Sequence, residues 1–336
     1  MGRAVVLCTL PLSAAGQHML SAAADIVVAP NPDAETMRGM VGDADVLVVR
    51  THLPADLFER PHRLIGVVRH GAGLDMIPVA AATAQNIPVA NVPGANAQSV
   101  AEYCVGSFIA LARRFGAMDR DLRTQGWAAA RGHCAGAGEL AGKTVGIVGV
   151  GAIGTALARI CHYGFGMRVL GYQPSTRALP EFVERAELND LLDASDFVSL
   201  HCPLTPETTH LFDAARLARM KPSAFLVNAA RGEVTDEAAL ARALAEGRVR
   251  GAAIDVFSRQ PLARDHPFLA LDNVILTPHA AALTRESVDR MSLEAVRQVF
   301  QLVAGTPPDH LVNPEVWPRR RRWTGPSAGL QKEATP

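Results

Sequence analysis

Residues 143–154 read Lys-Thr-Val-Gly-Ile-Val-Gly-Val-Gly-Ala-Ile-Gly, and the rest of the chain can be placed around them. Thr144–Val148 is a short apolar run rich in β-branched residues, which is typical of a buried parallel strand. Gly149, Gly151 and Gly154 follow in the spacing G-x-G-x-x-G, and a helical pattern opens behind them. In this setting the glycines allow a tight turn, a close backbone approach and close helix packing, and the helix N-terminus attracts phosphate. The stretch predicts a dinucleotide site; a purely structural glycine turn is the alternative.

The composition is that of a globular protein with more than one domain. At 336 residues the chain is longer than one ordinary core, and 49% of its residues are hydrophobic and 20% charged. Lys plus Arg and Asp plus Glu both total 33, so the net charge gives no reason to expect nucleic acid or a membrane surface as a partner. The basic cluster Arg319–Arg322 fits either a solvated tail or a tail that contacts phosphate.

The cysteines are odd in number, scattered and without a C-x-x-C pair: Cys8, Cys104, Cys134, Cys161 and Cys202. This pattern predicts neither a disulfide framework nor a zinc site, and it favours a reducing cytoplasm. The first apolar run, Val5–Leu10, is too short for a signal peptide, and no run approaches the ~20 apolar residues of a membrane helix. The sequence therefore predicts a cytoplasmic protein without a metal and without a membrane partner.

Residues 1 to about 98 alternate short apolar runs with helical stretches, which predicts a parallel sheet covered by helices. The expected strands are Ala4–Cys8, Asp25–Ala29, Asp45–Val49, Leu64–Val68 and Ile87–Ala90. The expected helices are Ser13–Ala24, Asp33–Val41 and Asp75–Gln85. Because this half lacks a glycine fingerprint, we expect it to bind the substrate.

A helix over Ser99–Phe115 is predicted to bridge the two halves, because its apolar residues recur three and four positions apart. The following segment, Gly126–Gly142, is rich in Gly and Ala and is expected to form an extended arm. Its Trp127 suits a contact between subunits, and a local cover over the core is equally compatible with the sequence.

A second alternating series begins at the glycine stretch and predicts six parallel strands in a doubly wound sheet. These are Thr144–Val148, Arg168–Gly171, Phe197–Leu200, Phe225–Asn228, Gly251–Asp255 and Val274–Leu276. A last helix, Arg285–Val303, is expected to pack back onto the first domain. The predicted domains are therefore a substrate domain made of residues 1–98 and 287–336, and a cofactor domain over residues 99–286 inserted in it.

Three residues follow these strands at the edge where such sheets bind ligands. Arg231 can present a planar, permanently charged fork to a carboxylate, although an arginine in a loop is commonly a surface residue. Asp255 can accept a hydrogen bond from the carboxamide of the cofactor, or it can cap a turn. His279 is a candidate proton donor, although a single histidine is more often structural.

Several motifs recur in an order that resembles the D-2-hydroxyacid dehydrogenase family. In the second half they are Gly149–Gly154, His201-Cys-Pro-Leu-Thr-Pro-Glu-Thr208, Asn228-Ala-Ala-Arg231-Gly, Asp255-Val-Phe and Thr277-Pro-His279. In the first half they are Val49-Arg-Thr51, Arg69-His-Gly-Ala-Gly-Leu-Asp75 and Ser99-Val-Ala-Glu102. The resemblance covers roughly residues 40 to 316.

The resemblance implies an α/β fold in which a Rossmann cofactor domain is inserted in a flavodoxin-like substrate domain. It also implies hydride exchange between NAD(P)(H) and a small 2-oxo or 2-hydroxy acid. Arg231 would hold the carboxylate and the reacting oxygen, and His279 would exchange the proton. Backbone N–H groups around Ala72 and Gly73, together with Arg50, would bind the substrate.

Two positions depart from the family pattern. Gln260 stands where the family usually has the glutamate that pairs with the histidine, and the amide can orient an imidazole but cannot stabilise its charge. At the end of the second cofactor strand, Gln173 replaces the acidic residue that rejects a 2′-phosphate, and Ser175, Thr176 and Arg177 follow. We therefore expect NADP(H) to be preferred. The expected cofactor contacts are Gly149, Gly151, Ala152, Ile153, Gly154, Gln173, Arg177, Cys202, Pro203, Thr208, Ala229 and Asp255.

The leading interpretation is a homodimeric reductase of acids like glyoxylate or hydroxypyruvate. Gln260 keeps two alternatives open. One is an oxidation that transfers no substrate proton, like that of formate. The other is a nucleotide-sensing binding module similar to transcriptional corepressors of the same fold. Arg50, His52 and His70 lie in the first-domain loops expected to set substrate specificity, and their types do not select one acid.

Overall fold

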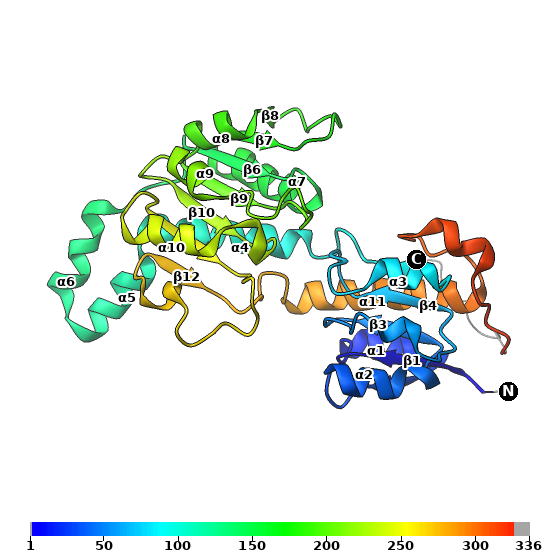
Figure 1. Ribbon diagram of the computed structural model, residues 1–336. Coiled ribbons are helices and arrows are strands. Elements are labelled where there is room, and N and C mark those ends of the chain that lie inside the picture. The colour runs from blue at the N-terminus through cyan, green and yellow to red at the C-terminus, as the bar shows by residue number, and fades with distance from the viewer. Residues whose placement is uncertain (1, 326–336) are drawn as a thin grey trace. The chain divides into compact units, whose positions relative to one another are not determined.

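The computed structural model describes residues 2–325 and divides into two compact units. Unit 1 comprises Met1–Asn96 with Thr284–Pro336, and unit 2 comprises Ala97–Leu283. Each unit has one sheet in which every strand pair is parallel, with helices packed around it (Figure 1). The predicted fold class is confirmed. Met1 and residues 326–336, the last part of the predicted third segment, lie outside the described residues.

Unit 1 has a five-stranded sheet in the order β2-β1-β3-β4-β5, which is the flavodoxin-like order. The strands are β1 (Ala4–Cys8), β2 (Ala24–Val28), β3 (Val46–Val49), β4 (Gly66–Arg69) and β5 (Val89–Ala90). The helices are α1 (Ala14–Ser21), α2 (Ala34–Met40), α3 (Val79–Ala84) and α11 (Arg285–Ala304), with 3-10 turns η1 (Val41–Asp43), η2 (Leu57–Glu59) and η7 (Pro314–Arg319).

Helix α11 contributes the largest helical face to the core of unit 1. Thr284 caps its N-terminus by accepting a hydrogen bond from the backbone N–H of Ser287, and Gly305 ends it with a φ of 76°. Met291, Ala295 and Val299 recur every fourth residue on its buried stripe and pack with the β1 and β3 side chains. The C-terminal part of the chain therefore belongs to the same core as the N-terminal strands.

Unit 2 has a seven-stranded sheet in the order β12-β11-β10-β9-β6-β7-β8. The strands are β6 (Thr144–Val148), β7 (Arg168–Tyr172), β8 (Glu184–Arg185), β9 (Phe197–Leu200), β10 (Phe225–Asn228), β11 (Gly251–Ile254) and β12 (Val274–Leu276). The helices are α4 (Ala97–Arg113), α5 (Phe115–Thr124), α6 (Trp127–Gly132), α7 (Ala152–Arg159), α8 (Leu188–Ala194), α9 (Ala214–Arg219) and α10 (Glu237–Ala245). The short turns are η3 (His133–Gly136), η4 (Ile160–Gly164), η5 (Gly232–Val234) and η6 (Pro267–Ala270).

The direction of winding in unit 2 reverses between β6 and β9, which pair side by side in the sheet. Strands β9 and β10 are buried at every position, as expected for central strands covered on both faces. In an open parallel sheet, ligands bind beyond the carboxyl ends of the strands at such a reversal. The residues that follow β6, β7 and β9 to β12 therefore form the candidate site.

The predicted extended arm is wrong. Residues Trp127–Gly132 form α6 and His133–Gly136 form η3, because Trp-Ala-Ala-Ala-Arg carries strong helix formers. The predicted single bridging helix is also two helices, since Arg114 adopts a left-handed φ of 56° and α5 starts at Phe115. Figure 1 shows α5 and α6 side by side beyond the end of α4.

Three further element predictions need correction. The sheet of unit 2 has a seventh strand, β8, whose two exposed residues carry no apolar signal. The helix expected over Asp75–Gln85 is shortened to α3, because Pro78 stands at its N-terminus and cannot continue a helix backwards. Strand β5 has only two residues of the expected four, since Pro88 lacks the N–H that a ladder needs.

The basic cluster near the C-terminus is tied to unit 1 in the described residues. The Arg320 guanidinium lies over the ring of Trp317, 3.4 Å from its centroid, and donates to the carbonyl of Gly305. Arg321 donates to the carbonyl of His62. Two of these arginines therefore serve packing and backbone hydrogen bonding. Among residues 2–325, no helix has the length and apolar character that crossing a membrane requires.

Candidate active site

The turn between β6 and α7 needs its glycines for different reasons. Gly149 has a φ of 98°, and a Cβ there would lie 2.7 Å from the backbone nitrogen of Cys202. A Cβ at Gly154 would lie 2.3 Å from the carbonyl oxygen of Gly149. A Cβ at Gly151, in contrast, would meet no atom within 4 Å. Two glycines are therefore required by close packing, and the third faces open space where a phosphate can approach.

Helix α7 begins in front of that open space. Gly151 is its N-cap residue, and no side chain of the described chain caps it. The first N–H groups of a helix, here those of Ala152 and Ile153, have no partner within the helix and carry its positive dipole end. The residues present therefore fit the pyrophosphate of a dinucleotide.

The loop after β7 is held in place by Arg185. Its guanidinium donates to the carbonyls of Gln173 and Ser175, each at 3.2 Å, and to that of Arg177 at 2.5 Å. The Gln173 amide nitrogen also donates to the carbonyl of Arg177, at 3.2 Å. Because these bonds all go to backbone oxygens, none of them uses the side-chain oxygen Oε1 of Gln173 or the side chain of Arg177.

The loop after β9 is braced by a threonine hydroxyl. Thr208 Oγ1 donates to the carbonyl of Pro203 at 2.7 Å and accepts from the backbone N–H of Thr205 at 2.8 Å. Burial raises the pKa of the Cys202 thiol to about 11, so it remains protonated at neutral pH. Ala229 directly follows β10, the next strand of the sheet. These predicted cofactor contacts lie at the ends of two neighbouring strands.

Arg231 stands in the loop that follows β10. The Asn228 side chain shapes this loop, since its Nδ2 donates to the carbonyl of Arg231 at 2.9 Å and its Oδ1 accepts from the backbone N–H of Ala230 at 3.0 Å. The next residue, Gly232, has no room for a side chain, because a Cβ would lie 2.1 Å from the carbonyl carbon of Phe257. The backbone that carries Arg231 is therefore fixed from both sides.

Asp255 caps the turn that carries the histidine. Its side chain is buried, and Oδ1 accepts from the Thr277 hydroxyl at 2.6 Å and from the N–H of Ala280 at 2.7 Å. Oδ2 accepts from the N–H of Ala281 at 3.0 Å, and the Asp255 carbonyl accepts from the N–H of His279 at 2.7 Å. Of the two roles open from the sequence, the structure shows the turn cap.

His279 occupies this turn in a left-handed conformation, with a φ of 55°. Its Nδ1 lies 3.1 Å from Gln260 Oε1. The Gln260 amide nitrogen donates to the carbonyl of Phe257 at 3.2 Å, which turns the amide oxygen towards the ring. Since an amide oxygen only accepts, Nδ1 must carry the hydrogen, and the neutral ring presents Nε2 as a proton acceptor.

The predicted substrate residues Ala72 and Gly73 belong to unit 1, in the loop after β4. The Arg69 guanidinium donates to the carbonyls of Gly73 at 3.1 Å and His70 at 2.6 Å. The Asn91 amide donates to the carbonyl of Ala72 at 2.7 Å. All these bonds use carbonyl oxygens of the loop, and none of them uses the N–H groups of Ala72 and Gly73.

The remaining specificity candidates of unit 1 differ in their surroundings. The Arg50 guanidinium donates to the carbonyl of Pro11, and burial lowers its pKa from the usual value. His70 is buried, with Nε2 2.9 Å from Ser292 Oγ, and desolvation lowers its pKa to about 3, so it is neutral. His52 is exposed, and no hydrogen bond of its ring is described. The neutral His70 therefore packs in the core of unit 1, where it is hydrogen-bonded to Ser292 of α11.

The sequence of unit 2 matches a known family over most of its length. A family model described as D-isomer specific 2-hydroxyacid dehydrogenase, NAD binding domain, matches residues 105–281, more than half of the chain. The chain belongs to this dehydrogenase family. The predicted family resemblance is confirmed.

Individual members of the 2-hydroxyacid dehydrogenase family are similar over nearly the whole chain. A glyoxylate reductase of Thermofilum pendens is 37% identical over 327 residues, which cover 94% of this chain and 96% of the relative. A D-3-phosphoglycerate dehydrogenase of Methanocaldococcus jannaschii is 37% identical, but its match covers 92% of this chain and only 59% of the relative. The crystal structure of the NADPH-dependent glyoxylate/hydroxypyruvate reductase of Sinorhizobium meliloti with NADP and malonate has a TM-score of 0.82 at 28% identity, covering 96% and 99% of the two chains.

This dehydrogenase therefore transfers hydride between a nicotinamide dinucleotide and a 2-oxo or 2-hydroxy acid. Unit 2 carries Arg231, His279 and Gln260 at the ends of neighbouring strands, and unit 1 carries Ala72, Gly73 and Arg50. When a nicotinamide is bound, it supplies or accepts the hydride, and the side chains of the chain supply charge, orientation and the proton.

Sequence reasoning missed residues that support the site from a distance. Arg185 lies on a short polar strand eight residues beyond Arg177, and no motif distinguishes it from a surface arginine. Glu237 accepts from the backbone N–H and the hydroxyl of Ser258, at 2.8 and 2.6 Å, and so braces the loop before Gln260. It starts helix α10, where an acidic residue is ordinary. Only the fold reveals these contacts.

Proposed function

We propose that this dehydrogenase reduces small 2-oxo acids of the glyoxylate or hydroxypyruvate type. The observation that carries this proposal is that Arg231 and His279 follow β10 and β12, the two strands that flank β11, on a sheet with an open phosphate turn. The glyoxylate reductase relative, similar from end to end, supports the size of the acid. Arg231 holds the carboxylate and the reacting oxygen, and His279 gives the proton.

The proposed roles follow from charge and geometry. The Arg231 fork matches a carboxylate and an adjacent carbonyl oxygen with parallel hydrogen bonds. As hydride reaches the carbonyl carbon, negative charge develops on the oxygen, and imidazolium Nε2–H of His279 donates to it. Gln260 keeps the ring oriented in both protonation states, because its oxygen accepts from Nδ1–H in each. The N–H groups of Ala72 and Gly73, with Arg50, are proposed to bind the rest of the anion.

The test is a screen of purified protein with glyoxylate, hydroxypyruvate, larger 2-oxo acids and formate, each with both cofactors, following nicotinamide absorbance. Reduction of glyoxylate or hydroxypyruvate with the highest kcat/KM is expected. Turnover of none of these compounds by folded, cofactor-binding protein would overturn the proposal and favour a nucleotide-sensing module.

A second candidate function is an oxidation that moves no substrate proton, such as that of formate. The Gln260–His279 hydrogen bond favours it, because the amide orients the ring without stabilising imidazolium. Formate oxidation in the same screen, faster than any 2-oxo acid reduction, would select this function instead.

For the cofactor we propose a preference for NADP(H). No carboxylate stands at position 173, and Ser175, Thr176 and Arg177 can donate to a 2′-phosphate. Arg185 holds the backbone of that loop in one shape and adds positive charge beside it. The NADP-bound structure of the Sinorhizobium meliloti relative supports the use of this cofactor in the family.

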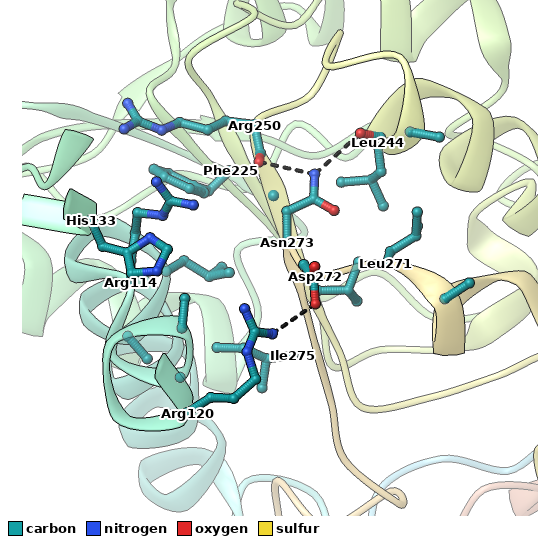
Figure 2. A pocket seen from close by; sticks show the side chains of 18 residues that line it. Arg114, Arg120, His133, Phe225, Leu244, Arg250, Leu271, Asp272, Asn273 and Ile275 are labelled. Carbon is teal, nitrogen blue, oxygen red and sulfur yellow. Dashed lines mark hydrogen bonds and ion pairs between the residues drawn. The ribbon is translucent and has the colours of Figure 1, made fainter. Parts of the chain in front are cut away.

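A homodimer formed through α5 and α6 is proposed as the assembly. Helix α5 buries none of its residues, and Phe115, Leu122 and Trp127 are exposed, the last to 70%. Beside these helices lies a cavity of about 740 Å³ between α4, α5 and the start of β12, shown in Figure 2 with Arg114, His133 and Arg250 on one wall and Asn273 opposite. A second copy of this chain is the occupant that would cover both the apolar helix face and the cavity.

Light scattering after gel filtration tests the assembly. Trp127→Glu should shift the protein towards the monomer, whereas Tyr163→Glu, at an equally exposed aromatic of unit 2, should not. A wild-type monomer, or a dimer insensitive to Trp127→Glu, would contradict this interface. We infer a cytoplasmic location because Cys8, Cys104 and Cys161 are free and buried, as suits a reducing compartment.

A further inference from the structure

The histidine turn is connected to helix α4 by a chain of hydroxyl groups. Tyr103, on α4, has its hydroxyl 2.8 Å from Thr277 Oγ1, across a sequence separation of 174 residues. Thr277 Oγ1 in turn lies 2.6 Å from Asp255 Oδ1. Asp255 then accepts from the N–H groups of Ala280 and Ala281, which directly follow His279. The chain thus runs from a helix on the face of the sheet to the proposed proton donor.

The direction of each hydrogen bond in this chain is determined. A carboxylate oxygen only accepts, so Thr277 must donate its single hydroxyl hydrogen to Asp255. Thr277 Oγ1 can then only accept from Tyr103, whose hydroxyl is therefore the donor. Burial raises the pKa of Tyr103 to about 12, with the Asp255 charge adding to the effect, so the phenol keeps its hydrogen throughout the neutral range. The donor hydroxyl of Tyr103 therefore keeps the hydroxyl hydrogen of Thr277 directed at Asp255.

This orientation matters because the turn is held in an unfavourable conformation. A non-glycine residue is strained at a positive φ, and His279 has a φ of 55°. The cost is offset by the hydrogen bonds that Asp255 accepts from the backbone around the histidine and from Thr277. Loosening one of them allows the ring to leave the place that Gln260 and the substrate need.

We propose that Tyr103 is a positioning residue for the reaction, acting through Thr277 and Asp255 on the turn that carries His279. This inference rests on the proposed role of His279 as the proton donor. Tyr103 touches neither substrate nor cofactor in this role. Its hydroxyl sets the distance and angle at which the imidazole meets the developing oxygen charge, and small displacements of such groups slow the chemical step.

The test compares Tyr103→Phe with the wild type in single-turnover reduction of glyoxylate by NADPH, in water and in deuterium oxide. Loss of one neutral hydrogen bond predicts a rate lower by about three- to tenfold. The KM for glyoxylate and the Kd for NADPH should change less than about twofold, since no binding group is removed. The solvent isotope effect should rise, because proton donation becomes a larger part of the barrier.

Matched variants separate this role from a general loss of stability. Tyr163→Phe removes the same hydroxyl from an exposed tyrosine of unit 2 and should leave every readout unchanged. Thr277→Val removes both hydrogen bonds and should slow the step more than Tyr103→Phe, whereas Thr277→Ser should stay near the wild type. Thermal unfolding of each variant reports whether it is folded, and the two threonine variants decide the matter if Tyr103→Phe fails to fold.

The outcomes distinguish this inference from the proposed function. If His279→Asn keeps its activity, the proposed proton donor is wrong. If His279→Asn is inactive but Tyr103→Phe turns over at the wild-type rate, the proposed function stands and the positioning role is overturned. A Tyr103→Phe variant that loses binding and rate together, with an unchanged solvent isotope effect, also overturns it, because that pattern indicates only a structural role.

Discussion

At the carboxyl ends of β10, β11 and β12, buried groups hold the residues that follow the strands of the unit 2 sheet. At the carboxyl end of β7, in the other half of the same sheet, an exposed arginine holds the loop. Asp255 is buried and accepts three hydrogen bonds through its side chain, all at 3.0 Å or less. Arg185 is exposed, and two of its bonds to the loop backbone are 3.2 Å long. We call the loops after β10, β11 and β12 the rigid edge of the sheet, and the loop after β7 its exposed edge.

The difference follows the tasks that we propose for the two edges. A proton donor and an anion clamp must be held to within a fraction of an ångström, and buried charge-assisted hydrogen bonds provide that. A loop that selects between two cofactors needs only the right charge near a phosphate. Substitutions on the rigid edge should therefore affect the rate and the fold, and those on the exposed edge should affect the choice of cofactor.

The largest effect is expected at Arg231. Replacing it with alanine removes the charge that pairs with the substrate carboxylate and should cost on the order of 3 kcal/mol or more in transition-state binding, measured as kcat/KM. Arg231→Lys keeps the charge but loses the bidentate fork, so it should fall between alanine and the wild type. An alanine variant with near-normal kcat/KM on its best 2-oxo acid would remove Arg231 from the site.

Asp255→Asn should give the next largest effect. The amide puts an N–H group where the carboxylate accepts from Thr277, Ala280 or Ala281, and it removes the charge from those bonds. We expect a loss of about 2–3 kcal/mol in the free energy of unfolding, together with a lower kcat.

Asp193→Asn is the matched control for Asp255. This aspartate pairs with Arg219 at the surface of unit 2, away from α5 and α6, so denaturant unfolding should change little. Equal stabilities of the Asp255 and Asp193 variants would show that the rigid edge is no more constrained than the surface.

Gln260→Glu is expected to act on the pH dependence. A carboxylate beside Nδ1 stabilises the imidazolium of His279, so the proton is retained to higher pH and the reductive pH–rate limb should move upwards. With Gln260, reduction should fall off at lower pH than in the variant, and oxidation should persist further into acid. A shift of the limb by one pH unit would correspond to about 1.4 kcal/mol of additional stabilisation of the imidazolium relative to the neutral ring.

The shift must be measured with chemistry rate-limiting and with folded protein. Identical profiles for the wild type and Gln260→Glu would mean that residue 260 does not control the charge of the histidine. The described hydrogen bond would then serve orientation alone.

The smallest effect on rate should come from the exposed edge. Gln173→Asp restores a carboxylate that repels a 2′-phosphate, so the ratio of kcat/KM with NADPH to kcat/KM with NADH should fall by about tenfold or more. The kcat with the preferred cofactor should stay unchanged. Arg185→Ala should change the same ratio in the same direction. A wild type that prefers NADH strongly would show that Arg177 does not reach the phosphate.

The sequence predicted the parts of the fold that depend on neighbouring residues. The β6 strand and its glycine turn were predicted because burial on both faces and phosphate binding each leave a local pattern. The break at Arg114 could not be predicted, since arginine has no preference for a left-handed φ. Strand β8 was missed because two exposed charged residues carry no strand signal.

The candidate site shows the same limit. Arg231, Asp255 and His279 were singled out because they follow strands, and the order of parallel strands places their ends at one edge of the sheet. The sequence leaves open whether Asp255 binds the carboxamide of the cofactor or caps a turn, since the N–H groups of Ala280 and Ala281 that it accepts from lie 25 and 26 residues away. The contact of Tyr103 with Thr277 joins residues whose proximity depends on how α4 packs on the sheet, and no local pattern encodes it.

Gly232 limits which substitutions the enzyme can accept, because position 232 has no room for a side chain. Because a Cβ there would lie 2.1 Å from Phe257 and 2.2 Å from the nitrogen of Ser258, the segments bearing Arg231 and Gln260 touch backbone to backbone. In a saturation library, active clones should return glycine alone at this position. We expect variation that alters which acid is accepted to map to unit 1, where the side chains of Arg69 and Asn91 hold the loop around Ala72 and Gly73.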